Sequence, residues 1–264
     1  MKSIGNILFA GLVLSCGAAV AESRVVIGAY NFPPIASVTT TGKVSGLLAD
    51  LVNELNTRQS DYAFVLFKTA PKRRYLDFQQ GHYDTIFFES TQWSWQAVEN
   101  QATPPLLMDE DVYVALKKPG RDQSFFDHLP QRRIVAMLGY HYGFANFETD
   151  EQRLRQNFDI LLSHNHRRNI ELLLIDRPSA AEIAIVSRSY LALHFTLNPT
   201  DQARLLISNK VDQRYALRAL TRPDGPISAD TLMALLNPLI QDGTYAALVK
   251  RYNLQLPDAL STKP

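Results

Sequence analysis

Short apolar segments alternate with amphipathic segments along most of this chain, and this alternation limits the possible folds more than any other feature of the sequence. In the first part of the chain, segments with the length and apolar content of strands lie at residues 25–29, 63–67, 85–88 and 112–116. Between them, apolar residues recur at helical spacing within residues 47–55 and 72–80. This order predicts a largely parallel sheet with helices on both faces.

The alternation starts again after the Lys-Pro-Gly turn at residues 118–120. Predicted strands lie at residues 133–138, 158–162 and 181–186, and predicted helices at residues 144–156 and 169–175. A strand at residues 215–219 and two helices at residues 228–242 and 244–252 complete the pattern. Because the series occurs twice, the sequence predicts two α/β lobes.

The first 21 residues have the three parts of a secretory signal peptide. Lys2 supplies the positive charge, residues 4–14 are apolar and uncharged, and residues 19–21 form an Ala-Val-Ala cleavage motif. The apolar run is shorter than a membrane-spanning helix. Alternatively, residues 13–16 resemble a lipobox, in which Cys16 is lipidated and becomes the mature N-terminus. Both routes place the protein outside the cytoplasm, and we expect it in the periplasm.

Composition excludes several classes of function. The 27 Lys and Arg residues nearly balance the 26 Asp and Glu residues, which argues against a nucleic-acid-binding protein. Cys16 is the single cysteine, so a disulfide framework and a multi-cysteine zinc site are excluded. No nucleophile elbow, phosphate loop, Rossmann glycine pattern or H-E-x-x-H motif occurs. We expect the close pair His164 and His166 to be solvated, and we expect no metal and no cofactor.

Five short motifs occur along the chain in a fixed order. They are a strand followed by Phe-Pro-Pro at residues 25–34, a Gly-x-x-x-Gly helix entry at 42–51, Gly-x-x-Asp at 81–84, Asp-Gly-Thr at 242–244, and a basic pair with an aromatic residue at 250–252. Together they resemble the bacterial extracellular solute-binding proteins of family 3, the receptors of polar amino acid uptake systems. The resemblance extends from about residue 24 to residue 254.

The resemblance implies a type II clamshell of two lobes, each a mostly parallel sheet flanked by helices. Residues 22–114 and 213–264 would form the first lobe, and residues 115–212 the second. Crossings near Ala115 and Val211 would form the hinge. A small polar, amino acid-like molecule would bind in the cleft, close the lobes and pass to the membrane subunits of an ABC transporter. We expect a monomer and a receptor rather than an enzyme.

Two other functions stay open. A few enzymes use this receptor fold, including periplasmic dehydratases of cyclic amino acids, and Glu89 near Arg73 could serve as the acid. A receptor that feeds a membrane sensor instead of a permease is the third possibility.

Several residues are candidates for the cleft. The Gly139 turn, with Tyr140, His141 and Tyr142, precedes a predicted helix, whose N-terminal N–H groups would suit a carboxylate. Among the three bases at residues 72–74, Arg73 matches the position that faces the cleft in a subgroup of the family, and its guanidinium could hold a carboxylate.

Further candidates follow the predicted strands. Phe32 matches the family position whose ring stacks on the ligand. Glu89 and Ser90 follow a buried strand, at the edge where α/β clefts collect ligands, and Trp93 comes next. In the family, an Arg after this strand holds the α-carboxylate, and an Asp in the second lobe holds the α-ammonium. In register, this chain has Gln96 and Ser187 at those positions, so the family clamp is replaced and the ligand is left open.

Overall fold

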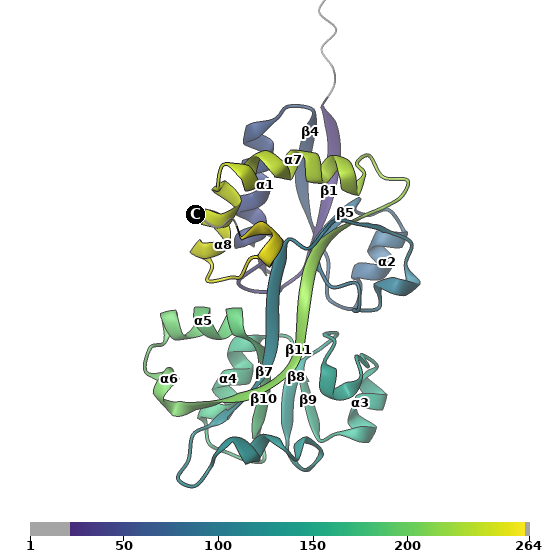
Figure 1. Cartoon of the computed structure of the whole chain (residues 1–264). Helices are drawn as coiled ribbons and strands as arrows, with labels where there is room; N and C mark the ends of the chain where they lie inside the picture. The colour runs from purple at the N-terminus through teal and green to yellow at the C-terminus, as the bar shows by residue number, and fades with distance from the viewer. Residues whose placement is uncertain (1–21, 262–264) are drawn as a thin grey trace, which may run out of the picture.

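Two long strands connect the two halves of the molecule. The computed structural model describes residues 22–261, and Figure 1 shows two lobes joined by β7 (Leu107–Leu116) and β11 (Leu205–Thr221). These two strands pair antiparallel along most of their length. The predicted signal peptide and Cys16 lie outside the described residues.

The first lobe is built on the sheet order β4-β1-β5-β11, in which β4, β1 and β5 are parallel and β11 is antiparallel to β5. Its strands are β1 (Ser23–Ala29), β4 (Tyr62–Lys68), β5 (Thr85–Glu89) and the short β6 (Gln101–Ala102), which pairs with β11. Its helices are α1 (Leu47–Arg58), α2 (Arg74–Gln79), α7 (Ala229–Gln241) and α8 (Thr244–Arg251). A small separate sheet pairs β2 (Ser37–Val38) with β3 (Val44–Ser45).

Helix α1 shows why the sequence pattern predicted this lobe. Its apolar residues recur at a helical spacing, so they form one stripe, and the stripe is buried. The buried residues are Leu47, Leu48, Leu51, Val52 and Leu55. Together with the inward side of the sheet they form the core of the first lobe.

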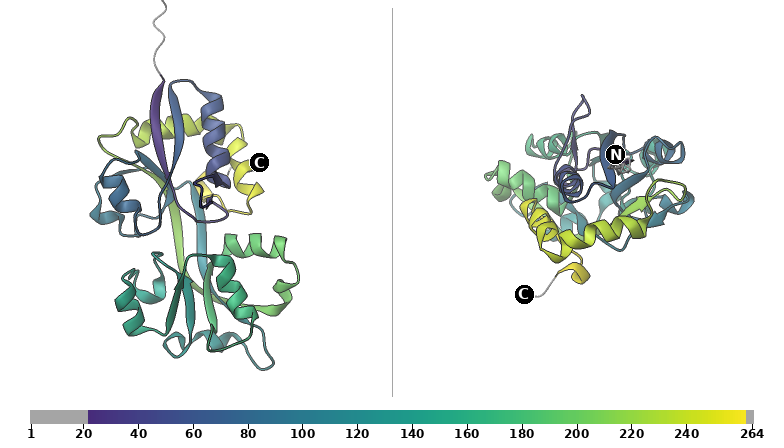
Figure 2. Two further views of the ribbon diagram at one scale, coloured as in Figure 1. Left: turned by 180° about the vertical axis from the view of Figure 1, so that it is seen from behind. Right: turned by 90° about the horizontal axis from the view of Figure 1, so that it is seen from above.

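The second lobe is built on the sheet order β7-β10-β8-β9. Strands β10, β8 and β9 are parallel, and β10 is antiparallel to β7. Its further strands are β8 (Ile134–Met137), β9 (Ile160–Ser163) and β10 (Ile183–Ser187). Its helices are α3 (Glu151–Asn157), α4 (His166–Leu174), α5 (Arg188–Leu197) and α6 (Asp201–Arg204). Figure 2 shows from behind that these helices flank the lower sheet. The two-lobe α/β clamshell predicted from the sequence is confirmed.

The core changes from one lobe to the other within β7 and β11. In β7, Leu107 packs in the core of the first lobe and Val112 in a core of the second. In β11, Val211 packs against the second lobe and Tyr215 within the first. The pairing of β11 with β7 shifts register on both sides of Val211, an irregularity that bends a strand. On β7 the change of core thus comes a few residues before the expected crossing at Ala115.

The helix predicted at residues 144–156 is wrong in its first half. Residues 143–145 form a single 3₁₀ turn, and α3 begins only at Glu151. Asn146 and Phe147 both have positive φ, which ends the turn, and the Asp150 side chain caps α3 by accepting from the Arg153 N–H at 2.9 Å. Apolar residues at helical spacing predicted one helix because these breaks do not alter the spacing.

Candidate functional site

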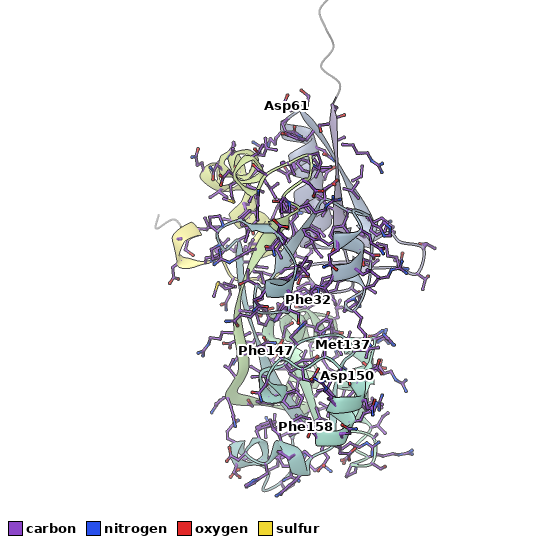
Figure 3. All side chains as sticks on the ribbon, turned by 90° about the vertical axis from the view of Figure 1, so that its right-hand side faces the viewer. Phe32, Asp61, Met137, Phe147, Asp150 and Phe158 are labelled. Carbon is purple, nitrogen blue, oxygen red and sulfur yellow. The ribbon has the colours of Figure 1, made fainter. Side chains whose placement is uncertain are left out.

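A small buried cavity lies where the two lobes and the two connecting strands meet. Its free volume is about 10 Å³, which is room for about one water molecule. Its lining residues are Tyr30, Phe32, Arg74, Trp93, Asp111, Tyr140, His141 and Tyr215. All of them except the partly buried Tyr140 are buried. Figure 3 places Phe32 at the lower edge of the first lobe, above Met137 and Phe147 of the second. Both lobes therefore contribute side chains to one cavity.

Arg74 is the basic group of the cavity. Its side chain is 2% exposed, and its Nε atom lies 3.2 Å from Glu89, which is 0% exposed. The guanidinium also lies over the rings of Tyr30 and Tyr75, at 5.0 and 4.4 Å from their centroids. The Trp95 indole N–H donates to Glu89 Oε2 at 2.6 Å and holds the carboxylate in place.

The electrostatics of this pair follow from its burial. Burial acts to lower the pKa of Arg74, but the Glu89 carboxylate, together with Tyr30, Tyr75 and Tyr83, outweighs it and the pKa is raised, so Arg74 stays charged. Burial raises the pKa of Glu89, and Arg74 and the hydrogen bond from Trp95 act in the opposite direction. Arg74 and Glu89 thus form a buried pair whose charges balance.

Asp111 is the acidic group that lines the cavity, and it comes from β7. Its carboxylate accepts from Gln213 Nε2 at 2.8 Å and from the Tyr215 hydroxyl at 3.2 Å, and both partners lie on β11. The Trp93 indole N–H donates to Gln213 Oε1 at 3.1 Å. Burial, followed by the nearby carboxylates of Asp212 and Asp109, raises the pKa of Asp111 well above its ordinary value.

Aromatic rings form most of the cavity wall. Tyr30 and Phe32 are stacked with an interplanar angle of 3°, and Tyr140 stands at 87° to Tyr30 and 88° to Phe32. Trp93 meets Phe32 edge to face and contacts Tyr215 at a centroid distance of 4.9 Å. Rings that meet at near right angles enclose space between their faces and edges, and they bury much apolar area.

Two hydrogen bonds beside the cavity join the lobes. The Tyr140 hydroxyl donates to the Asn31 carbonyl at 2.7 Å, and His141 Nε2 lies 2.8 Å from Ser94 Oγ. Burial, helped by the charge of Arg74, lowers the pKa of His141 to about 3, so the imidazole is neutral near pH 7. In the described chain, His141 Nδ1 is buried and has no hydrogen-bond partner. These contacts hold the lobes together over the cavity.

Four of the nine predicted site residues line the cavity. They are Phe32, Trp93, Tyr140 and His141. Glu89 lies behind Arg74 and does not reach the lining, and Ser90 is buried at the end of β5, where its carbonyl accepts from the Trp93 N–H.

The remaining predicted residues lie elsewhere. The Tyr142 hydroxyl accepts from the Met137 N–H inside the second lobe, and Ser187 caps α5 by accepting from the Tyr190 N–H. Gln96, which the resemblance predicts at the position of the family's arginine, is exposed.

Arg73 does not face the cavity, which corrects the choice among the three bases. Its side chain is 64% exposed and pairs with Asp77 on the same helical turn. Consecutive helical residues point about 100° apart, so a shift of one residue in the start of a helix decides which side chain faces inward. Helix α2 begins at Arg74, and this residue is the one that lines the cavity.

The N–H groups expected to bind a ligand carboxylate are already occupied. The Gly143 and Phe144 N–H groups donate to the carboxylate of Asp212 on β11, at 2.7 and 2.8 Å. Asp212 also accepts from the Tyr113 hydroxyl at 2.6 Å. The anion at this turn is therefore the protein's own, which contradicts the role predicted for the turn after Gly139.

The sequence motifs did not point to Tyr30, Arg74, Asp111 or Tyr215. For Asp111 a signal was present. Residues 109–111 are all acidic and precede an apolar strand, and side chains alternate between the faces of a strand. Asp109 and Asp111 therefore share one face, and Glu110 takes the other, where it pairs with Arg188 and Arg214. Asp111 lies directly opposite Ser187 in the pairing of β7 with β10.

The histidine pair corrects another expectation. His166 is buried rather than solvated, it lies between Tyr140 and Tyr190, and burial lowers its pKa to about 4. Within residues 22–261, no three His, Cys, Asp or Glu side chains are grouped closely enough to hold a metal ion.

No known family model matches the sequence, and no curated protein does. Solved structures do match. A putative binding component of an ABC transporter from Wolinella succinogenes, complexed with lysine, is 16% identical over 88% of this chain and 95% of its own, with a TM-score of 0.68. The chain has the periplasmic-binding-protein fold. Most of the similar structures that we compared are binding proteins of amino acid transporters.

Two other similar structures are connected by name with an enzyme or with a sensor. The ancestral amino acid-binding protein AncCDT-1, a precursor of cyclohexadienyl dehydratase, is 16% identical over 88% of this chain and 95% of its own, with a TM-score of 0.64. A histidine kinase sensor domain is 14% identical over 90% of this chain and 99% of its own, with a TM-score of 0.66. At such identities the fold is shared, and function must be argued from the site. No helix in residues 22–261 has the length and apolar character needed to cross a membrane.

Proposed function

We propose that this protein is an exported solute receptor that binds a small polar, amino acid-like molecule between its lobes and delivers it to an ABC-type transporter. The observation that carries the proposal is the cavity itself, because its lining comes from both lobes and from both connecting strands. A ligand there would touch every part that must move for the lobes to open. Binding energy would therefore favour the closed arrangement.

The cavity chemistry supports a small ligand with polar groups. Arg74 and Asp111 place a base and an acid in a wall that is otherwise aromatic. Pockets of this kind fix orientation through a few polar groups and gain affinity from apolar contact. The free volume in this arrangement is about 10 Å³, so the lobes must move apart before a ligand can enter. The export signal predicted for residues 1–21 agrees with a periplasmic receptor.

A thermal-shift screen of amino acids, small peptides, polyamines and organic acids tests the proposal. A ligand present at 100 times its dissociation constant stabilises the folded state by about 2.7 kcal/mol, which raises the melting temperature measurably. Small-angle scattering with and without the hit then measures closure, and a ligand should reduce the radius of gyration. If the protein is folded and none of the compounds changes its melting temperature, the result contradicts a receptor function.

Two further measurements separate the proposal from its alternatives. Chromatography of each hit after incubation with the protein should show the compound unchanged, and turnover would indicate the enzyme alternative instead. Glu89 is poorly placed as an acid for such an enzyme, because it faces Arg74 and Trp95 rather than the cavity. Recovery of permease subunits with the tagged protein from membranes is expected, and recovery of a sensor kinase would indicate the signalling role.

A further inference from the structure

Four aromatic residues of the cavity offer no unpaired polar hydrogen: Phe32, Trp93, Tyr140 and Tyr215. The Tyr140 hydroxyl is bound to the Asn31 carbonyl, and the Tyr215 hydroxyl donates to Asp111. The Trp93 N–H is bound to Gln213. Phe32 has no polar atom. A ligand group held by these side chains therefore meets aromatic rings, whose π faces attract cations.

Asp111 has no basic partner. In the described part of the chain its carboxylate receives only the hydrogen bonds from Gln213 and Tyr215, and no ion pair. The charged groups that act most strongly on it, Asp212 and Asp109, have the same sign. A buried carboxylate is costly unless it is paired or protonated. The cavity therefore contains an acidic group that a cation would satisfy.

Arg74 does not supply that cation. Its charge is balanced by Glu89 at 3.2 Å and is further covered by the rings of Tyr30 and Tyr75. The Arg74–Glu89 pair adds no net charge to the cavity. Asp111 is left as the unbalanced group, and the aromatic wall has the same preference for positive charge.

From these contacts we infer that the ligand is recognised through an organic ammonium group seated between Asp111 and the rings of Phe32, Trp93, Tyr140 and Tyr215, and that a ligand carboxylate is dispensable. The inference rests on the proposed receptor function and narrows it to one class of solute. It also explains how the chain can lack the family's clamp at Gln96 and Ser187. Asp111, opposite Ser187, supplies the acidic group from the neighbouring strand.

Calorimetric titration of the whole mature protein with matched probes tests the inference. Choline carries a permanent ammonium charge, and the alcohol with a tert-butyl group in place of its trimethylammonium group has the same shape without the charge. Lysine and cadaverine carry primary ammonium groups with and without an α-carboxylate. We expect at least one ammonium probe to bind. If choline binds, its uncharged analogue should bind at least about 30-fold more weakly. We expect cadaverine to bind at least as well as lysine where a primary amine is preferred.

Two variants assign the effect to the named residues. Asp111→Asn keeps the shape of the side chain and should lower the affinity for the best ammonium probe at least about tenfold. Glu110→Gln is the matched control, because Glu110 is the next residue on β7 and faces Arg188 and Arg214 outside the cavity. Phe32→Leu should also lower the affinity for the cation, since it removes an aromatic ring and leaves Asp111 in place. Circular dichroism checks that each variant is folded.

The outcomes separate this inference from the proposed function. If a neutral or anionic solute binds and closes the lobes while no ammonium probe binds, the ammonium site is wrong and the receptor function stands. Unchanged affinity in Asp111→Asn also overturns the inference. If neither the probes nor the broad screen gives any binding to folded protein, both proposals fail.

Discussion

Arg73 and Arg74 are adjacent in the sequence but have opposite surroundings. Arg73 is mostly exposed and forms an i,i+4 pair with Asp77, the kind of pair that contributes well under 1 kcal/mol. Arg74 is buried against Glu89. We expect Arg74→Ala to lower the free energy of unfolding by about 3–5 kcal/mol, because it leaves a buried carboxylate unpaired. Urea unfolding followed by circular dichroism measures this value.

Arg73→Ala is the matched control for that measurement. The two substitutions remove the same side chain from neighbouring positions of one helix start, so any difference reflects surroundings alone. We expect Arg73→Ala to stay within about 0.5 kcal/mol of the parent. Equal losses in the two variants would show that the pairing of Arg74 with Glu89 does not carry the difference.

Asp111 makes the affinity for a permanent cation depend on pH. In the empty site, burial and the carboxylates of Asp212 and Asp109 raise the pKa of Asp111, so its carboxyl group keeps its proton at a higher pH than usual. A cation binds the carboxylate form and releases that proton. Affinity for choline should therefore rise with pH, by at most about tenfold per unit, and become constant above the pKa of Asp111.

Titrations of choline between about pH 5 and 9 check this direction. Arg74 stays charged and His141, with a pKa of about 3, stays neutral in this range. Burial raises the pKa of the neighbouring Asp109 to about 6, so its ionisation adds to the rise only at the low end of the range. Asp111→Asn should therefore remove the pH dependence above about pH 7. Affinity that falls as pH rises would contradict the assignment.

At the scale of elements, the turn after β8 controls how closely the lobes approach. Gly139 has φ +76°, and a Cβ there would meet Lys72 Cγ at 2.5 Å, the Lys72 amide nitrogen at 3.1 Å and Pro71 Cβ at 3.2 Å. Lys72 and Pro71 belong to the first lobe, so the clash lies across the interface. We expect Gly139→Ala to weaken ligand affinity and to enlarge the liganded radius of gyration, because full closure is obstructed.

Gly120→Ala separates this clash from backbone strain. Gly120 has φ +73° in the same lobe, but a Cβ there would meet nothing within 4 Å. Both substitutions impose an unfavourable left-handed conformation that costs about 1 kcal/mol. Only Gly139→Ala should change closure. A similar loss of affinity in both variants would assign the effect to strain.

The elements that could be predicted from the sequence are those whose apolar spacing decides their burial. The stripe on α1 and the apolar strands gave the two-lobe α/β fold correctly. The helix predicted from residue 144 failed because Asn146 and Phe147 adopt positive φ, in a turn whose N–H groups bind Asp212, which is 68 residues away from Phe144. Hydrogen bonds between distant segments leave no periodic signal in the sequence.

The same distinction explains the site. Phe32, Trp93, Tyr140 and His141 were found because they follow strand ends or match family positions. Choosing Arg74 over Arg73 required the exact start of α2, and helix boundaries are the least certain part of a sequence prediction. Asp111 was missed because β7 begins earlier than its apolar run.

At the scale of the whole molecule, closure depends on a small number of contacts between the lobes. Phe147 and Tyr140 from the second lobe pack against the core of the first, and Lys72 pairs with Glu151 at the surface at 2.9 Å. The partly buried polar contacts are the Tyr140–Asn31 and His141–Ser94 hydrogen bonds. With only β7 and β11 joining the lobes, these side chains set the balance between open and closed forms (Figure 1).

Removing both hydrogen bonds should shift that balance. A hydrogen bond of this kind contributes about 1 kcal/mol net, so Tyr140→Phe combined with Ser94→Ala should disfavour the closed form by about 2 kcal/mol. This value corresponds to a change of about 30-fold in the ratio of closed to open molecules, and ligand affinity should fall by up to the same factor. Small-angle scattering of the ligand-free protein should show a larger radius of gyration than in the parent.

Tyr142→Phe is the control. It also removes a tyrosine hydroxyl group, two residues after Tyr140, but this hydroxyl forms its hydrogen bond within one lobe. The Tyr142 hydroxyl accepts from the Met137 N–H, and both residues belong to the second lobe. Its loss should lower the free energy of unfolding by about 1 kcal/mol and leave the scattering profile unchanged. If the double variant scatters like its parent, the two hydrogen bonds do not hold the lobes, and closure depends instead on the packing of Tyr140 and Phe147 against the first lobe.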